Sequence, residues 1–360
     1  MSDFIPVCQP TISREDSEAV ARVVTSRWLG TGPEVQAFED ELGEYLGQPV
    51  VAVASCTAAL FLCLRALGIG PGDRVAVPAL TFAATANVVV HARAEVCFAD
   101  VDPKTWRLSA EALEFRRRDI TATIPVDIYG QPCSGDELVN LPGRVIRDAA
   151  HLIGADYRQN GEAAACFSFY PTKNITTIEG GAVATSDPKI ADYVRTMSQH
   201  GLTADAWKRY GPDAGLSYDV LEAGYKANMT DVQAALGRSQ LRRLPEFRER
   251  REALAQRYDA ALPGLERPAR SPRGIAHLYP VVVPYGRDRN AVRERMRQDG
   301  VGTGVHFESL TAMRRYSTAL GTCPVAEYIG ARTLSLPLYP HLMEQQQDRV
   351  VESFKRAVSW

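Results

Sequence analysis

The sequence predicts an α/β protein with two parts. A large domain is built on a mostly parallel, seven-stranded sheet, and a smaller C-terminal α/β domain follows it. Short apolar runs alternate with helical patterns from residue 50 onwards. Apolar runs of this kind are typical of strands that are buried on both faces of a parallel sheet. With 360 residues, 45% of them hydrophobic, the chain is long enough for such a domain and a second one.

Two helices are expected before the sheet. Ser13 followed by Asp16 is typical of a helix N-cap. Pro33 is expected to open the second helix and Gly47 to close it, and the apolar face between them is formed by Val35, Phe38, Leu42 and Leu46. We expect residues 1–30 to form an N-terminal segment that packs on the small domain.

The large domain is expected over residues 31–244. Its strands are predicted at 50–54, 74–78, 95–99, 120–129, 145–148, 164–170 and 181–185. Helices are predicted at 58–67, where Gly68 is the stop signal, and at 83–91. Residues 202–224 lack clear periodicity and are expected to form a loop over a site.

The small domain is expected over residues 245–360. Two helices, at 229–244 and 245–262, lead into it. A strand at 277–283, a helix at 290–299, a strand at 301–307 and a final helix at 345–358 complete the prediction.

Composition limits the partners of the protein. The formal net charge of −2 gives no electrostatic reason to expect nucleic acid or an anionic membrane. No apolar run approaches the roughly 20 residues that span a bilayer, and the start MSDFIPVCQP lacks the blocks of a signal peptide. The seven cysteines are scattered and form no CxxC pair, which favours buried, reduced thiols in a cytoplasmic protein over disulfides or a zinc site.

Several residues that can carry chemistry follow the predicted strands. In a parallel sheet, ligands bind beyond the carboxyl ends of the strands. Lys173 comes just after the apolar run 164–170. Lost hydration lowers the pKa of a lysine and makes the neutral amine a nucleophile towards carbonyls, although a lysine here can also be an ordinary solvated group. Ser55 and Thr57 stand where a strand turns into a helix, which suits a phosphate or simply an N-cap.

Three further residues are each compatible with a purely structural role as well as with a functional one. Asp148 ends the strand VIRD and can hold a protonated ring nitrogen, or cap the next turn. Phe82 alone is typical of a core residue, and His151 alone of a structural histidine. A lysine, an aspartate, an anion cradle and an aromatic ring at strand ends are together the parts that a pyridoxal phosphate site needs.

Six motifs in order carry a resemblance to a known family. They are ASCTAAL at 54–60, PALTFAATAN at 78–87, RDAAHLIGADY at 147–157, FSFYPTKNITTIEGGA at 167–182, HGL at 200–202 and NMTDVQAALG at 228–237. The series resembles the DegT/DnrJ/EryC1 family of pyridoxal-phosphate nucleotide-sugar aminotransferases, which have the aspartate aminotransferase type I fold. The resemblance covers nearly the whole chain, from 28–35 to 334–340.

The resemblance implies a role for each matching residue. Lys173 would form the Schiff base (internal aldimine) and later move the proton. Asp148 would pair with the pyridinium nitrogen. The other implied cofactor contacts are Phe82 on the ring face, His151 near the phenolic oxygen, Thr57, Ala58 and Ser168 on the phosphate, and Asn228 from the partner subunit of a homodimer.

One position departs from the family pattern. Relatives usually carry Glu before the aspartate, whereas this chain has Arg147. Successive residues of a strand point to opposite faces, so we expect Arg147 to point away from the ligand of Asp148.

The resemblance also implies an activity. Related dehydratases carry histidine at the position of Lys173, so the lysine indicates transamination. The segment NITTIEGG resembles members that act at C4, which implies amination of a nucleotide-linked 4-keto-6-deoxyhexose with L-glutamate as donor. A C3 or amino-cyclitol aminotransferase, or a non-catalytic regulator that binds the cofactor, are the alternatives. His306 and Tyr170 are the expected substrate contacts, and no metal is expected.

Overall fold

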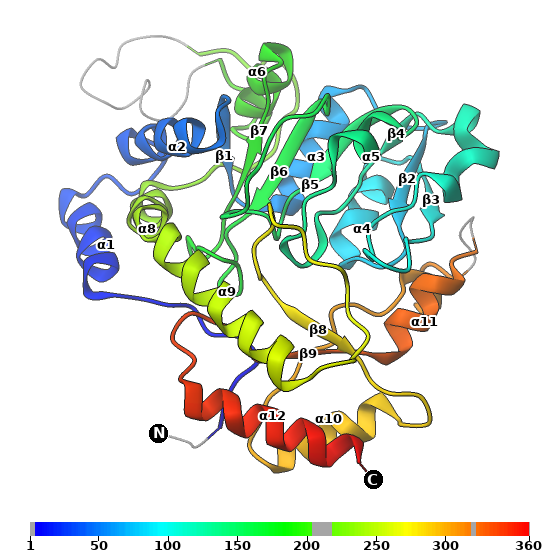
Figure 1. Ribbon diagram of the computed structural model, residues 1–360. Helices are drawn as coiled ribbons and strands as arrows, with labels where there is room; N and C mark the ends of the chain where they lie inside the picture. Colours follow the sequence, from blue (N-terminus) through cyan, green and yellow to red (C-terminus); the bar gives the residue numbers. More distant parts are fainter. Residues whose placement is uncertain (1–3, 204–217, 318–321, 360) are drawn as a thin grey trace.

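The computed structural model describes residues 4–203, 218–317 and 322–359 (Figure 1). Its centre is one seven-stranded sheet in the order β1-β7-β6-β5-β4-β2-β3. Most of the predicted loop 202–224, namely residues 204–217, lies outside the described residues.

The sheet is mostly parallel, as predicted. Its strands are β1 (Val50–Val53), β2 (Arg74–Pro78), β3 (Glu95–Ala99), β4 (Ala122–Thr123), β5 (Arg144–Asp148), β6 (Ala164–Ser168) and β7 (Gly181–Ala184). Strand β7 runs antiparallel to both of its neighbours, β1 and β6. The other neighbouring pairs are parallel, so the carboxyl ends of β2, β3, β4, β5 and β6 lie at one edge.

Helices cover both faces of this sheet. The helices α3 (Cys56–Ala66), α4 (Ala83–His91) and α6 (Pro188–Met197) share a core with one face, and α2 (Pro33–Leu46) and α8 (Asp231–Arg242) share a core with the other. Strand β1 shows why a strand covered on both faces can be apolar throughout. Val51 and Val53 belong to the α3 side, whereas Val50 and Ala52 belong to the α2 side.

The helix ends follow the local chemistry of the sequence. Ser13 caps α1 (Arg14–Ser26) in a capping box with Asp16, as predicted. Gly47 closes α2 in the left-handed conformation with φ of 73°. Helix α1 packs on α8, where Val23 contacts the core around Ala235.

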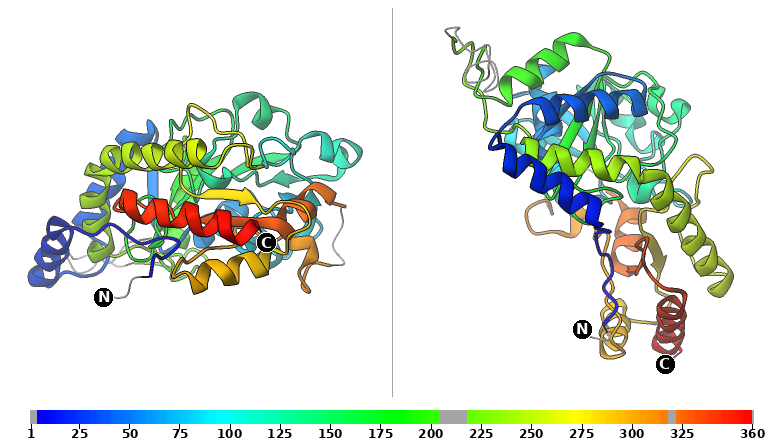
Figure 2. Two further views of the ribbon diagram at one scale, coloured as in Figure 1. Left: turned by 60° about the horizontal axis from the view of Figure 1, so that its bottom comes forward. Right: turned by 90° about the vertical axis from the view of Figure 1, so that its left-hand side faces the viewer.

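The C-terminal part packs around the antiparallel pair β8 (Tyr279–Val282) and β9 (Thr333–Leu336). Helices α9 (Leu244–Ala261), α10 (Arg289–Gln298) and α12 (Glu344–Val358) cover it, and α11 (Pro324–Arg332) precedes β9. Figure 2 shows α10 and α12 side by side, with the N-terminal segment running down beside α10. There the backbone N–H of Ile5 donates a hydrogen bond to the carbonyl of Gly300, and the N–H of Leu338 donates to the carbonyl of Val7.

Short elements fill the connections of the large sheet. They are η1 (Glu111–Asp119), η2 (Ile128–Gly130), α5 (Gly135–Val139) and, near the small domain, η3 (Leu310–Ala312). Among the helices in the described part of the chain, none is long and apolar enough to cross a membrane.

Two predicted strands are wrong. Of 120–129, only Ala122–Thr123 forms a strand; Val126 adds an isolated bridge to Asp148, and the chain then turns at Tyr129 and Gly130, which have φ of 58° and 83°. Of 301–307, only isolated bridges form, from Val301 to Ile5 and from Gly304 to Ser335. The elements α6, α11 and β9 were not predicted from the sequence.

Candidate active site

A cavity of about 520 Å³ lies where the strands of the large sheet end and the small domain begins. It brings together most of the residues singled out from the sequence: Thr57, Phe82, Asp148, His151, Ser168, Tyr170, Lys173 and His306. Ala58 and Asn228 are the two that do not line it. The cavity therefore lies where the strand-end argument places it.

Lys173 stands on the wall of this cavity in a tight turn after β6. Its backbone N–H donates to the carbonyl of Tyr170 at 2.8 Å. Burial of the amine lowers the pKa of Lys173 to about 8, although Cys56 and Asp148 act in the opposite direction. A larger share of this amine is thus neutral near pH 7 than of a solvated lysine.

Asp148 is a buried carboxylate whose hydrogen-bond partners are neutral. The hydroxyl of Thr85 donates to Oδ2 at 2.9 Å, and the N–H of Ala150 donates to Oδ1 at 3.2 Å. The thiol of Cys56 donates to Oδ1 from 3.9 Å. Burial raises the pKa of Asp148, and the bond from Thr85 opposes that rise. The bond from Ala150 is the turn cap considered above, so the carboxylate caps the turn and faces the cavity.

Arg147 points to the opposite face of β5, as predicted. Its guanidinium donates to both oxygens of Asp127, at 2.6 and 2.9 Å. Glu162 lies 3.6 Å from the same guanidinium. Arg147 is only 1% exposed, so these carboxylates supply the charge that its burial requires.

His151 lies in the cavity wall with its ring fixed. Its Nδ1 accepts the backbone N–H of Tyr129 at 3.1 Å, and its ring lies 4.4 Å from that of His277. Burial lowers the pKa of His151 well below its usual value, so the ring is neutral near pH 7. Because Nδ1 accepts a bond, the single ring proton is on Nε2.

The first turn of α3 forms another wall. Ser55 is its N-cap, and the hydroxyl of Ser55 accepts the N–H of Ala58 at 3.1 Å. Strand β7 approaches this turn so closely that a Cβ on Gly181 would lie 2.4 Å from the nitrogen of Cys56. Glycine is therefore required there, and Thr57 is left at the cavity surface with Ser168.

Aromatic side chains line the open side of the cavity. Phe82 precedes α4 and is 62% exposed. Its ring centroid lies 6.0 Å from that of Phe307. Tyr170 is 47% exposed. An aromatic ring that is this exposed beside a cavity can cover a flat ligand.

His306 comes from the small-domain side. Its ring folds back over Gly304, where a Cβ would lie 2.3 Å from the ring. Burial lowers the pKa of His306 to about 4, with Lys173 adding to the effect. Its Nδ1 has no partner among the described atoms.

Asn228 lies outside this cavity. Its side chain donates to the hydroxyl of Thr31 at 2.6 Å and accepts from Lys226 at 2.6 Å. Its backbone bridges to Val53 at the end of β1. Asn228 therefore stands near the same sheet edge without reaching the cavity of its own chain.

The sequence reading missed several lining residues. Among them are Cys8, Thr85, Glu179, His277 and Phe307. Thr85 had a usable signal, because it lies within the motif PALTFAATAN at 78–87; its hydroxyl is 3.0 Å from that of Thr81. The others come from loops or from the small domain, where the sequence has no local signal.

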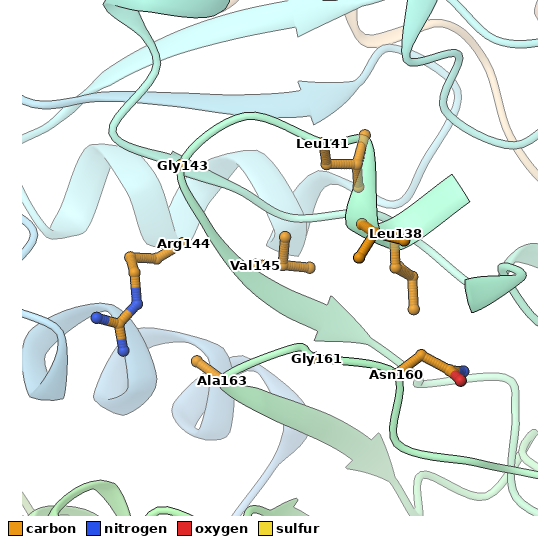
Figure 3. A pocket seen from close by; sticks show the side chains of 9 residues that line it. Leu138, Leu141, Gly143, Arg144, Val145, Asn160, Gly161 and Ala163 are labelled. Carbon is orange, nitrogen blue, oxygen red and sulfur yellow. The ribbon is translucent and has the colours of Figure 1, made fainter. Parts of the chain in front are cut away.

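A second cavity, of about 350 Å³, lies at the opposite ends of β5 and β6 (Figure 3). Leu138, Leu141, Gly161 and Asn160 are among its lining residues. In Figure 3 Arg144 extends away from these leucines. Its lining side chains are apolar apart from Arg144 and the amide of Asn160, and the lining includes no nucleophile or acid–base pair.

The fold and the main cavity define a pyridoxal-phosphate-dependent transferase of the type I class. Residues 10–355 match the sequence profile of the DegT/DnrJ/EryC1/StrS aminotransferase family, and the chain belongs to that family. It is therefore a pyridoxal-phosphate-dependent sugar aminotransferase. The predicted family, fold class, enzyme class and cofactor are confirmed.

Individual relatives match over the whole chain. The "Spore coat polysaccharide biosynthesis protein SpsC" of Bacillus subtilis is 40% identical over an alignment of 379 residues, gaps included. The alignment covers 99% of this chain and 97% of that protein. The PMP-form structure of "Putative sugar aminotransferase Spr1654" from Streptococcus pneumoniae has a TM-score of 0.90 at 29% identity, covering 99% of both chains. A PLP-form of the same protein is similar. Aminotransferase TlmJ from Streptoalloteichus hindustanus is 30% identical, with a TM-score of 0.88 and 99% of both chains covered.

The residues of the cavity fit this cofactor. Asp148 is a buried carboxylate with only neutral hydrogen-bond partners in the described structure, so a protonated ring nitrogen would supply the missing positive charge. Phe82 offers an exposed ring face. The start of α3 offers the helix terminus that phosphates prefer.

Proposed function

We propose that the protein transfers the amino group of L-glutamate to C4 of a nucleotide-linked 4-keto-6-deoxyhexose. The observation that carries this proposal is Lys173, a desolvated amine in the cavity that also contains Asp148. The following segment, NITTIEGG, resembles family members that act at C4. The name of SpsC, a polysaccharide biosynthesis protein, supports a sugar substrate.

Each side chain has one task in this proposal. The bound cofactor supplies an electron sink. Lys173 holds the cofactor and, once released, carries the proton to and from the reacting carbon. The neutral amine that this requires follows from its lowered pKa. Asp148 would keep the ring nitrogen protonated, since among the described residues no cation is hydrogen-bonded to its carboxylate.

The remaining contacts orient the cofactor. His151 would be left with Nε2–H as its free donor for the phenolic oxygen, because its Nδ1 accepts the N–H of Tyr129. Phe82 covers the ring. Thr57 and Ser168 hold the phosphate through hydroxyls, and Ala58 contributes to the same turn, although its N–H is bound to Ser55.

We further propose that the active unit is a homodimer. Asn228 lies beside the sheet edge but outside its own cavity, which suits a residue that completes the site of a second copy. Phe82 and Tyr170 on the cavity wall, and the nearby Ile178, are exposed in the single chain. A second copy would cover them. In this proposal residues 31–244 bind the cofactor, residues 245–360 form the small domain, and residues 1–30 pack on the small domain through Ile5 and Val7, while α1 lies on α8.

His306 and Tyr170 are the proposed contacts of the sugar or its diphosphate. Both line the cavity. The hydrogen bonds to the carboxylate of Asp148 come instead from Cys56, Thr85 and Ala150. His306→Ala should therefore raise KM for the keto sugar and leave the glutamate half-reaction nearly unchanged. Equal loss in both half-reactions would place His306 in the shared catalytic centre.

The experiment that tests the function is a substrate panel. The holoenzyme is incubated with L-glutamate and with dTDP-, UDP- and GDP-linked 4-keto and 3-keto sugars, and products are identified by mass spectrometry and NMR. A 4-amino-4,6-dideoxy product supports the proposal, and Lys173→Ala is the control without turnover. A 3-amino product would establish the C3 alternative. Intact cofactor binding without amino transfer to any sugar or cyclitol would establish a regulator.

A further inference from the structure

Tyr129 connects the two sides of the active site. It is 1% exposed and stands in the turn η2. Its backbone N–H donates to Nδ1 of His151 at 3.1 Å. Its phenolic hydroxyl donates to the backbone carbonyl of His306 at 2.6 Å. One residue thus holds a ring from the large domain and a backbone segment from the small domain.

The turn that carries Tyr129 is itself fixed by hydrogen bonds of Asp127 and by close packing at Gly130. Asp127 accepts two hydrogen bonds from the buried Arg147 and another, at 2.7 Å, from the N–H of Cys133. Gly130 has φ of 83°, and a Cβ there would lie 2.3 Å from the carbonyl of Ile275. The turn therefore has little freedom to shift.

Tyr129 itself is also constrained. Its backbone has φ of 58°, which residues other than glycine rarely adopt. Its ring packs edge-on against the buried Trp106 at 5.9 Å. A buried side chain in a strained backbone position is retained where the surrounding structure determines it, and such positions cluster at functional sites.

We infer that Tyr129 is a positioning residue for the sugar half-reaction, because its hydroxyl fixes the segment that carries His306 into the cavity. This inference rests on the proposed role of His306. The segment is otherwise irregular, since Gly304 shares only an isolated bridge with Ser335. Without the phenolic bond, the carbonyl of His306 loses its partner and the ring loses its fixed place over Gly304.

The variant Tyr129→Phe separates the two bonds. It removes the hydroxyl that holds His306 and keeps the N–H that holds His151. We expect KM for the keto sugar to rise about five- to tenfold, the loss of one neutral hydrogen bond, and the glutamate half-reaction to stay unchanged. Both are measured in single turnovers of the holoenzyme.

Tyr258→Phe is the matched control. Tyr258 is fully buried in the small-domain core, and its hydroxyl donates to the carbonyl of Pro337 at 2.9 Å. It does not line the cavity. This variant loses the same kind of bond, so it reports how much of any change is general destabilisation. We expect it to leave KM for the keto sugar unchanged.

A second readout does not depend on knowing the sugar. The chain has six histidines, so the ring of His306 can be followed by histidine-selective NMR and assigned with His306→Gln. Three titratable groups interact electrostatically with this ring: the amine of Lys173 and the rings of His151 and His277. Loosening the segment would admit water, so in Tyr129→Phe the pKa of His306 should rise by about one unit. In Tyr258→Phe it should not.

The outcomes are distinct. A raised KM with a raised pKa of His306 in Tyr129→Phe alone supports the inference. An unchanged pKa, or equal effects in both variants and both half-reactions, overturns it. If the wild-type enzyme accepts no keto sugar, the proposed function fails, and the NMR titration still decides whether Tyr129 positions His306.

Discussion

The amine of Lys173 offers a direct test of the site through pH. Burial lowers its pKa from 10.5 to about 8. At pH 7.5 a lysine with a pKa of 8 is neutral in about a quarter of molecules, against about one in a thousand for a solvated lysine. The reactive fraction thus differs roughly 200-fold, which decides whether the amine can act as a nucleophile near neutral pH.

Competitive labelling of the apoenzyme measures this pKa. Trace acetic anhydride is applied between pH 6.5 and 11, and peptide mass spectrometry follows labelling at each lysine. We expect the Lys173 profile to have its midpoint near pH 8. Lys189, exposed on α6, is the solvated reference in the same chain. Parallel profiles for the two lysines would refute the argument that the cavity desolvates Lys173.

The same shift has a consequence for stability. Because the pKa of Lys173 is lower in the folded chain, the unfolded chain binds more protons between pH 8 and 10.5. The contribution of Lys173 to apoenzyme stability therefore increases with pH across this window and is least favourable below pH 8. The fall in the pKa of Lys173 from 10.5 to about 8 corresponds to about 3 kcal/mol at most, because the side chain is only partly buried.

Urea denaturation of Lys173→Met gives the comparison for this effect. The variant has no amine at this position, so we expect the apo variant to be the more stable form at pH 7. The difference between the two proteins should shrink towards pH 10.5. A difference that stays constant with pH would show that the shift in pKa is absent.

Three other substitutions test separate parts of the site. Asp148→Asn should slow turnover on the order of 10²-fold while the cofactor stays bound, because it removes the charge that stabilises a protonated ring; near-normal turnover would contradict this role. Gly181→Ala should lower Tm and cofactor affinity, because its Cβ would meet the backbone of Cys56 at 2.4 Å; an unchanged affinity would show that the α3 turn does not hold the phosphate. Mixed dimers of Lys173→Ala and Asn228→Ala subunits should keep one intact site if Asn228 acts in the partner, whereas absence of activity would place its action within its own chain.

The strands of the sheet were predictable because they are buried on both faces. Strands β2 and β3 have the predicted bounds, and β1, β5 and β7 differ by one residue at an end. Every residue from Val50 to Val53 is buried, so the run is apolar throughout and easily recognised. The short helix of Ala83–His91 was also placed correctly.

The two wrong strands have a common cause, because outside Ala122–Thr123 their residues form isolated bridges and no continuous ladder. Residues 124–129 follow the two paired residues of β4, but the backbone turns at Tyr129 to bond with residues of two other segments. Residues 301–307 contain Gly302 and Gly304, which allow close approach by Phe4 and by the ring of His306. Tertiary contacts override a β pattern in such segments.

The candidate site was predictable where it depended on strand ends. Asp148, Ser168 and Lys173 follow β5 and β6 and meet at one cavity, as the parallel sheet requires. His277 and Cys8 reach the same cavity from the small domain and the N-terminal segment. Their positions depend on how the two parts pack together, and no pattern within either stretch reports that packing.

Arg147 shows how a departure from the family pattern can leave the chemistry intact. The pleat of β5 separates it from Asp148, so the two charges belong to different environments although they are adjacent in the chain. On its own face Arg147 binds Asp127 and lies near Glu162, and both carboxylates are buried with it. Asp127 in turn anchors the turn that carries Tyr129. A charge that first appears to disturb the cofactor strand therefore stabilises, from the far side of the sheet, the turn that positions His151 and His306.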